Sequence, residues 1–356
     1  MQIHGGNITE ITRKYNLKED TIIDFSSNIN PLGFPRSVNT LLRREGHNIL
    51  RYPDSHSTEL KHEIARRFDI NEKTILVGNG STELIYLIPR VFKPQCALIP
   101  IPTFTEYEKS LLSIECELRY VPLKEKELFR VNIAEIINLL PKIDIVYLCN
   151  PNNPTGLILP ESEVKTLIAE AEKRGVLVVI DEAFMDFADS VSATEEITRR
   201  KNLIIIKSLT KFFGIPGLRL GYLVANSKIV DKMNYYKEPW TVNILAQKVG
   251  IACFKDRTFR LKTKRFIERE RKYLLAELSK LKGLKPFSSS ANYLLVKITR
   301  LGLSSGKLYE YIARQGLLIR DCRSFRGLGD KFIRVAVKGR RENNLLIKNL
   351  KRVLEK

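Results

Sequence analysis

Short apolar runs, rich in β-branched residues, alternate with longer amphipathic segments through the first two thirds of the chain. Mainly apolar runs of this length are typical of strands buried on both faces. The runs lie at 74–77, 97–100, 117–122, 143–149, 176–180 and 203–206, and the clearest helical segments lie at 57–68 and 161–174. The alternation predicts an α/β fold with a mostly parallel sheet of about seven strands between helices.

The pattern changes after Trp240. The strongly basic segment 255–285 has apolar residues at helical spacing, which predicts an amphipathic helix with its charges in solvent. Further strands are expected at 291–298, 317–320 and 331–337, a helix at 307–315, and a last helix at the end of the chain. We therefore expect a large domain, 46–240, and a smaller α+β domain formed by 241–356 and completed by 1–45.

Polar residues follow several of the predicted strands, at the edge of the sheet where such folds bind ligands. The most informative stretch is SLTKFFGIPGLR, residues 208–219, which follows the strand at 203–206. Lys211 could bond covalently to a phosphorylated aldehyde, while Ser208, Thr210 and Arg219 bind its phosphate. The alternative is a surface loop with ordinary basic residues.

Other strand ends suggest further parts of the same site. The sequence GNGSTE, 78–83, follows a strand and would offer free backbone N–H groups to a phosphate, although a simple helix cap by Ser81 or Thr82 is the alternative. Asp181 follows a buried strand and would need a partner there. A protonated ring nitrogen is one such partner, and a helix cap or a structural ion pair is the alternative.

Three more residues have both a functional and an ordinary interpretation. Asn153 could bind a phenolic oxygen of a cofactor, or serve only the turn in NPTG. Phe104 could stack on a ring, or belong to the core. Arg334 could clamp a carboxylate with both nitrogens, or lie on the surface of an edge strand.

The composition narrows the class of protein. The chain has 356 residues, of which 44% are hydrophobic and 28% charged, and no apolar run approaches the length of a membrane-spanning helix. The N-terminal sequence lacks a signal-peptide pattern, so we expect a cytoplasmic protein without membrane association. Five scattered cysteines indicate reduced, buried thiols, and four histidines without zinc-type spacing give no reason to expect a metal.

The formal net charge of +20 allows two explanations. Anionic small-molecule substrates are one, and nucleic-acid binding is the other. The basic residues are dispersed and no nucleic-acid reader motif is present, so the sequence favours a small anionic substrate and no nucleic-acid partner.

Taken in order, these motifs resemble the fold-type I pyridoxal-phosphate enzymes of the class I/II aminotransferase superfamily. The resemblance covers nearly the whole chain, through GNGSTE, PTF, NPNNPTG, DEAF, SLTKFFGIPGLRLGY and FIRVAV. It implies pyridoxal 5'-phosphate bonded to Lys211, with Asp181 at its ring nitrogen, and a homodimer with shared active sites. The other cofactor-binding residues that it implies are Asn153, Phe104, Gly80, Ser81, Thr82, Ser208, Thr210, Arg219 and, from the neighbouring subunit, Tyr52.

Within this superfamily, HGGN at residues 4–7 and DFSSNINPLG at 24–33 resemble the decarboxylases of L-threonine O-3-phosphate in cobalamin biosynthesis. The resemblance implies a phosphorylated amino-acid substrate, whose phosphate and carboxylate contact His4, Asn28, Arg320 and Arg334. His4 could instead be a disordered terminal residue, and Asn28 a loop cap.

The histidinol-phosphate aminotransferases are the alternative family. Phe184 stands where most aminotransferases of this group have a tyrosine, so one hydrogen bond to the cofactor is absent, which weighs against transamination. Serine phosphate remains open as a substrate, because one methyl group changes binding by only about 1 to 3 kcal/mol.

Overall fold

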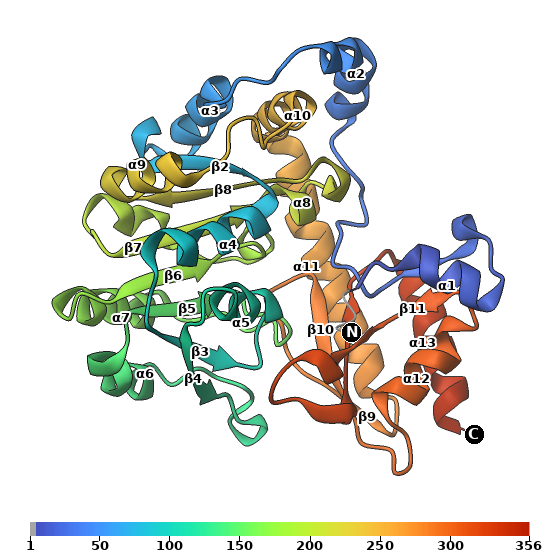
Figure 1. Cartoon of the computed structure of the whole chain (residues 1–356). Coiled ribbons are helices and arrows are strands. Elements are labelled where there is room, and N and C mark those ends of the chain that lie inside the picture. Colours follow the sequence, from blue (N-terminus) through green and yellow to red (C-terminus); the bar gives the residue numbers. More distant parts are fainter. Residues whose placement is uncertain (1–4, 356) are drawn as a thin grey trace.

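A seven-stranded sheet forms the centre of the protein in the computed structural model, which describes residues 5–355 (Figure 1). The strand order is β2-β8-β7-β6-β5-β3-β4. The bounds are β2 Ile75–Asn79, β3 Cys96–Ile101, β4 Glu117–Pro122, β5 Ile145–Cys149, β6 Leu177–Asp181, β7 Leu203–Ser208 and β8 Leu220–Ala225. All neighbouring pairs are parallel except those of β8, which runs antiparallel to β2 and β7. The predicted mostly parallel sheet is confirmed.

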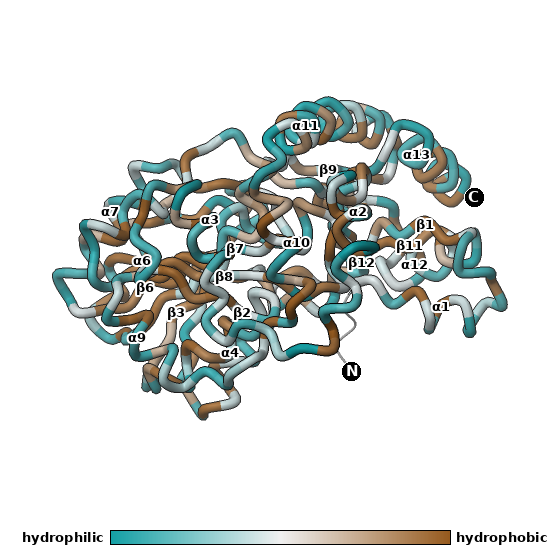
Figure 2. Tube along the Cα trace, turned by 90° about the horizontal axis from the view of Figure 1, so that it is seen from above, coloured by the Kyte–Doolittle hydropathy of each residue, from teal (hydrophilic) through white to brown (hydrophobic). Residues whose placement is uncertain are grey.

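Helices cover both faces of this sheet. One face packs against α4 Gly80–Phe92, α5 Thr105–Leu112 and α9 Ser227–Tyr236. The other packs against α3 Thr58–Phe68, α6 Ile133–Leu139, α7 Glu161–Lys173 and α10 Ile244–Lys255. Successive strand residues belong to opposite faces, as Ile204 and Ile205 do in β7. Figure 2 shows mainly hydrophobic central strands, coloured brown. In α11 and α13, hydrophilic teal and hydrophobic brown alternate, as in amphipathic helices.

A smaller antiparallel sheet, of order β12-β13-β10-β9, lies beside the large one. Its strands are β9 Leu284–Pro286, β10 Tyr293–Ile298, β12 Arg320–Asp321 and β13 Phe332–Ala336. The helices that accompany it are α11 Arg257–Ser279, α12 Ser305–Ala313 and α13 Arg340–Glu355. Near the N-terminus, α1 Ile8–Tyr15 precedes β1 Ile23–Asp24, which pairs in parallel with β11 Leu317–Leu318. This pairing joins the N-terminal segment to the C-terminal part of the chain.

Some elements differ from the sequence-based expectation. The single strand expected at 317–320 is two short strands, β11 and β12, in different sheets. The helix expected over 255–285 ends at Ser279, and β9 follows it. The pattern also missed β8 and the helices α2 Arg36–Glu45, α6, α8 Leu209–Phe212, α9 and α10.

The boundary between the two units remains a prediction. The helix α10 begins after residue 240, yet its residues Ala246 and Val249 pack in the core on one face of the large sheet.

Within residues 5–355, no helix combines the length and apolar character needed to cross a membrane. All five cysteines are free and buried, so the predicted burial is confirmed.

Candidate active site

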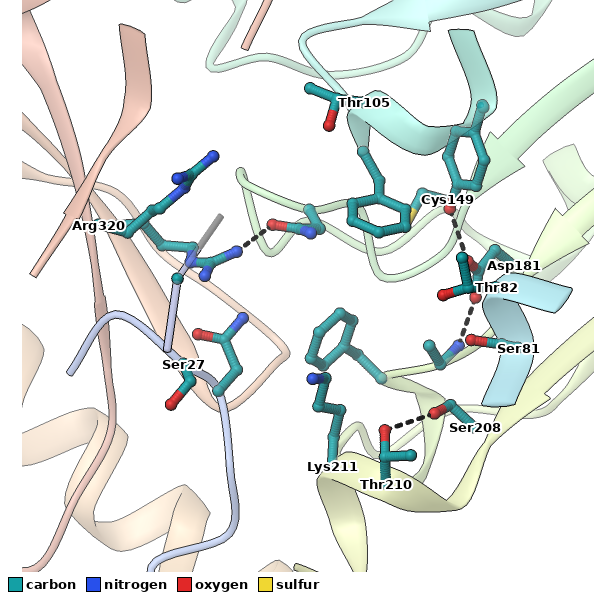
Figure 3. A pocket seen from close by; sticks show the side chains of 18 of the residues that line it. Ser27, Ser81, Thr82, Thr105, Cys149, Asp181, Ser208, Thr210, Lys211 and Arg320 are labelled. Atoms are coloured by element: carbon teal, nitrogen blue, oxygen red, sulfur yellow. Dashed lines mark hydrogen bonds between the residues drawn. The ribbon is translucent and has the colours of Figure 1, made fainter. Parts of the chain in front are cut away.

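A pocket of about 210 Å³ lies where β5, β6 and β7 end and where the N-terminal segment meets the smaller sheet (Figure 3). Most of the sequence-predicted site residues line it, although they are far apart in the chain. They are Asn28, Ser81, Thr82, Phe104, Asn153, Asp181, Ser208, Thr210, Lys211, Arg219, Arg320 and Arg334. In Figure 3, Arg320 approaches from one side, Asp181 and Ser81 lie on the other, and Lys211 extends between them.

Asp181 is a buried carboxylate at the end of β6. It accepts hydrogen bonds from the Tyr107 hydroxyl at 2.7 Å and from the Ala183 N–H at 2.9 Å. Burial raises the pKa of Asp181 to about 6, and these two hydrogen bonds oppose the rise. A cation placed beside Asp181 would favour its charged form.

Lys211 lies in α8, directly after β7. Burial lowers the pKa of its amine to about 8, and the charges of Arg334 and Arg219 lower it further in the same direction. A substantial fraction of the amine is therefore neutral near pH 8. Only the neutral amine can attack an aldehyde, so this environment suits a covalent lysine.

Strand alternation places the neighbours of these residues on the opposite face of the sheet. Glu182 follows Asp181, and Lys207 precedes Ser208, so both point away from the pocket. They form an ion pair there, in which both side chains are almost fully buried. The pair anchors the ends of β6 and β7 to each other beneath the pocket.

Ser81, Thr82, Ser208 and Thr210 form a cluster of hydroxyls at one end of the pocket. Ser81 and Thr82 lie in the first turn of α4, where backbone N–H groups have no partner within the helix. The hydroxyls of Ser208 and Thr210 lie 2.8 Å apart. Helix N–H groups, hydroxyls and the Arg219 guanidinium make this end suitable for a phosphate group.

Gly80 does not line the pocket, but it makes room for Arg219. Its φ is +76°, a conformation that glycine adopts without strain. A Cβ on Gly80 would lie 3.0 Å from Cζ of Arg219 and overlap the guanidinium. Gly80 therefore affects the site indirectly, because its lack of a side chain leaves space for the Arg219 guanidinium.

Arg320 and Arg334 lie on the side of the pocket formed by the smaller sheet. They are direct cross-strand neighbours in β12 and β13, and both are buried. Arg320 donates to the Ser324 hydroxyl at 2.7 Å, and Arg334 donates to the Ser26 carbonyl at 2.7 Å and to the Asn153 amide oxygen. Burial, followed by the charge of Arg334, lowers the pKa of Arg320 to about 10.

Several polar atoms here lack a protein partner. Nε of Arg334 and Oδ1 of Asn28 are buried and have no hydrogen-bond partner within the described part of the chain. Buried polar atoms are normally paired, and one left unpaired costs about 1 to 3 kcal/mol. A ligand could pair them only after a small turn of the Arg334 and Asn28 side chains.

Two aromatic clusters shape the pocket walls. Phe104 packs edge-on against Tyr107, with ring centroids 5.6 Å apart. Phe184 packs edge-on against Tyr293 at 5.0 Å, and the Tyr293 hydroxyl donates to the Asn152 carbonyl. Phe184 thus lines the pocket without contributing a hydroxyl.

Two predicted residues lie elsewhere. His4 falls outside the described residues. Tyr52 does not line the pocket, and it is 81% exposed with its ring 5.2 Å from that of Trp240. This exposure is compatible with the implied role in a neighbouring subunit.

The sequence reasoning missed other lining residues. They are Gly5, Ser26, Ser27, Thr105, Tyr107, Cys149, Ala183 and Phe325. Tyr107 had a usable signal, because it lies three residues after Phe104 and so on the same side of one helical turn. The remaining residues gave no signal that separates them from ordinary loop and core positions.

The residues present fit a phosphorylated aldehyde with a protonated ring nitrogen. Lys211 would bind its aldehyde, Asp181 its ring nitrogen, and the hydroxyl cluster with Arg219 its phosphate. The positive charges of the adjacent Arg320 and Arg334 remain for a second anionic molecule beside it.

Comparison with known proteins gives consistent matches over almost the full chain. The family described as aminotransferase class I and II matches residues 20–348. A putative threonine-phosphate decarboxylase of Caldanaerobacter subterraneus subsp. tengcongensis is 38% identical over 99% of this chain and 94% of its own length. The threonine-phosphate decarboxylase of Salmonella typhimurium is 36% identical over 99% and 96%. The crystal structure of the histidinol-phosphate aminotransferase from Clostridium acetobutylicum matches with a TM-score of 0.87 and 32% identity, over 93% of this chain and 98% of that one.

Proposed function

Since the chain belongs to the aminotransferase class I and II family, whose cofactor is pyridoxal phosphate, we propose that it decarboxylates L-threonine O-3-phosphate. The products would be CO₂ and (R)-1-amino-2-propanol O-2-phosphate, for the cobalamin nucleotide loop. The resemblance to two threonine-phosphate decarboxylases supports this substrate.

One observation of the site carries the proposal: Arg320 and Arg334 lie directly opposite each other on adjacent antiparallel strands. Like charges in this arrangement destabilise a sheet, and both guanidinium groups are buried as well. A substrate that carries both a carboxylate and a phosphate would neutralise the two charges. An ordinary amino acid would supply only one of the two anionic groups.

The cofactor, when bound, supplies an electron sink for the pair left behind when a bond to the substrate Cα breaks. Asp181 would keep the ring nitrogen protonated, and the hydroxyl cluster would fix the phosphate end. Arg334 would bind the substrate carboxylate or its phosphate, and Arg320 the other group. Binding the substrate at these two points would fix its orientation and so decide which of its Cα bonds breaks. Lys211 would then deliver a proton to Cα after CO₂ leaves.

A histidinol-phosphate aminotransferase is the second candidate, supported by the match to the Clostridium acetobutylicum structure. That reaction requires an amino acceptor and a proton transfer from Cα to the lysine. The lack of a hydroxyl on Phe184 favours decarboxylation over this alternative.

We also propose that the protein is a homodimer in which each active site receives Tyr52 from the neighbouring chain. Ile49, Leu50, Tyr52 and Trp240 are all more than half exposed. Large apolar groups exposed together are typical of an interface. The close contact of Tyr52 with Trp240 indicates that they belong to one surface.

The deciding experiment is an incubation of cofactor-loaded protein with O-phospho-L-threonine, analysed for CO₂ and aminopropanol phosphate by mass spectrometry. Parallel incubations contain O-phospho-L-serine, or histidinol phosphate with 2-oxoglutarate. Aminopropanol phosphate formed without an amino acceptor supports the proposal. Glutamate formed only from histidinol phosphate and 2-oxoglutarate would establish the aminotransferase instead.

A further inference from the structure

A second pocket, of about 660 Å³, lies on the face of the large sheet opposite the active site. It is bordered by the end of α3, the segment 185–195 and the first two turns of α11. Its charged residues are the cations Arg67, Lys207, Arg257, Arg260 and Lys264 and the acids Asp186 and Glu195. The pocket is thus strongly basic, and none of these residues takes part in the proposed reaction.

Two of the five cations are already neutralised. Lys207 is paired with the buried Glu182, which also accepts from the Ala193 N–H at 2.8 Å. Arg67 lies 3.3 Å from Asp186. The pocket's excess positive charge therefore comes from the start of α11, which supplies three cations against the one remaining acid, Glu195.

The three cations of α11 form one stripe. Arg257, Arg260 and Lys264 are spaced by three and four residues, which places them on the same side of the helix. None of them makes an ion pair with any residue between 5 and 355. They repel one another, and Arg257 and Arg260 lie in the first turn, where the macrodipole also disfavours cations. The first turn contains no acidic residue, and the carboxylate of the N-cap Asp256 accepts a hydrogen bond from the Phe259 N–H at 2.8 Å.

Arg260 supplies an independent observation. Its Nη1 is enclosed by protein and has no hydrogen-bond partner among the described residues. An enclosed guanidinium N–H without an acceptor is costly, so the partly buried Arg260 side chain would gain a hydrogen bond by turning Nη1 toward an acceptor in the pocket. Arginine and lysine together match the oxygen atoms of phosphate groups.

We propose that this pocket binds a small molecule that carries two or more phosphate groups. Its volume lies in the range of small-molecule sites, roughly 300–1,000 Å³, and exceeds what a single phosphate ion would fill. Arg257, Arg260 and Lys264 bind the phosphates, and the Lys207–Glu182 pair forms the floor of the site. The inference does not depend on the reaction that the active site catalyses.

Calorimetric titration of the cofactor-loaded protein with inorganic pyrophosphate, at an ionic strength held constant with sodium chloride, tests this proposal. Arg260→Met and Lys264→Met should each weaken the affinity about tenfold or more, because each removes a charged hydrogen-bond donor. Lys262→Met and Arg265→Met are the matched controls, since both residues lie on α11 outside this pocket, and each should leave the affinity unchanged.

Arg320→Met separates this pocket from the active site, and should leave the pyrophosphate affinity of the pocket unchanged. Loss of all binding in Arg320→Met, with full binding in Arg260→Met, would place the pyrophosphate in the active site and overturn the proposal. Equal weakening by Lys262→Met would show only diffuse attraction to a basic helix, and also overturn it. Thermal unfolding and cofactor absorbance identify any misfolded variant. If Arg260→Met is misfolded, the affinity of Lys264→Met for pyrophosphate decides the test.

Discussion

In the cofactor-free protein, the burial of Asp181 makes the stability of the fold depend on pH. Burial raises its pKa to about 6, so the folded protein holds this proton more tightly than the unfolded chain. The stability contributed by the protonated form is complete below about pH 4 and is lost as the pH rises to about 6. The loss amounts to about 3 kcal/mol, from the size of the pKa shift.

Asp181→Asn should therefore abolish this fall in stability between pH 4 and pH 6 in the cofactor-free protein. Urea unfolding at several pH values measures the free energy of unfolding of variant and wild type. The contributions of other titrating groups cancel in the difference between the two. The same substitution should weaken cofactor binding, since an amide cannot neutralise a protonated ring nitrogen. Identical pH profiles of variant and wild type would refute the assigned environment of Asp181.

Lys211 should govern the rate at which the cofactor-free protein takes up pyridoxal phosphate. Its pKa of about 8 means that the reactive neutral amine increases as the pH rises toward and beyond 8. The rate of appearance of the visible absorbance should follow a titration with a midpoint near pH 8. Stopped-flow absorbance measures this rate.

Lys211→Ala should bind the cofactor without the covalent bond, and borohydride should fix no label to it. Lys262→Ala, on the outer side of α11, provides the control and should be labelled like the wild type. A borohydride-fixed label in Lys211→Ala would mean that another lysine forms the bond.

At the scale of single elements, the turn between β2 and α4 positions the phosphate-binding groups. Gly80→Ala should strain the backbone at φ +76° and displace Arg219, so the cofactor affinity should fall about tenfold or more. Gly175→Ala is a matched control: its φ is +71°, and no atom lies within 4 Å of the added Cβ. Both variants should lose about 1 to 3 kcal/mol of stability from the positive φ, but only Gly80→Ala should lose cofactor affinity in an absorbance titration.

The element scale also shows why the sequence pattern found some segments and missed others. The strands β3, β5, β6 and β7 are apolar on both faces, so their runs are unmistakable. The helix α10 is buried against α2 and α3, and its sequence ILAQKVGIACFK is apolar on most sides, which removes the helical periodicity. The strand β8 directly follows the lysine loop, whose turn residues obscured its start.

At the scale of the whole molecule, the exposed Tyr52 should act across a dimer interface. Mixed dimers of Tyr52→Ala and Lys211→Ala chains should then contain one site with both residues intact. That site should combine full cofactor affinity with borohydride labelling, a combination that neither variant has alone. No recovery on mixing, with dimers present in sedimentation, would mean that Tyr52 does not serve the neighbouring site.

The sequence by itself determined which residues could carry the chemistry. Polar residues directly after apolar runs mark the edge of a parallel sheet, and strand alternation is local, so Asp181 and Ser208 were predictable as pocket residues. The order of the motifs also indicated the family, which the match to residues 20–348 confirms.

Only the tertiary structure decided which distant segments meet. The register of β12 and β13 sets Arg320 opposite Arg334. The Ser26 carbonyl accepts a hydrogen bond from Arg334, although the two residues are 308 positions apart in the sequence. The structure also shows which side of α11 borders the second pocket and that Nη1 of Arg260 is enclosed. Both facts depend on how α3 and the segment 185–195 pack near α11. Strand order and register depend on long-range packing, which leaves no periodic signal in a single sequence.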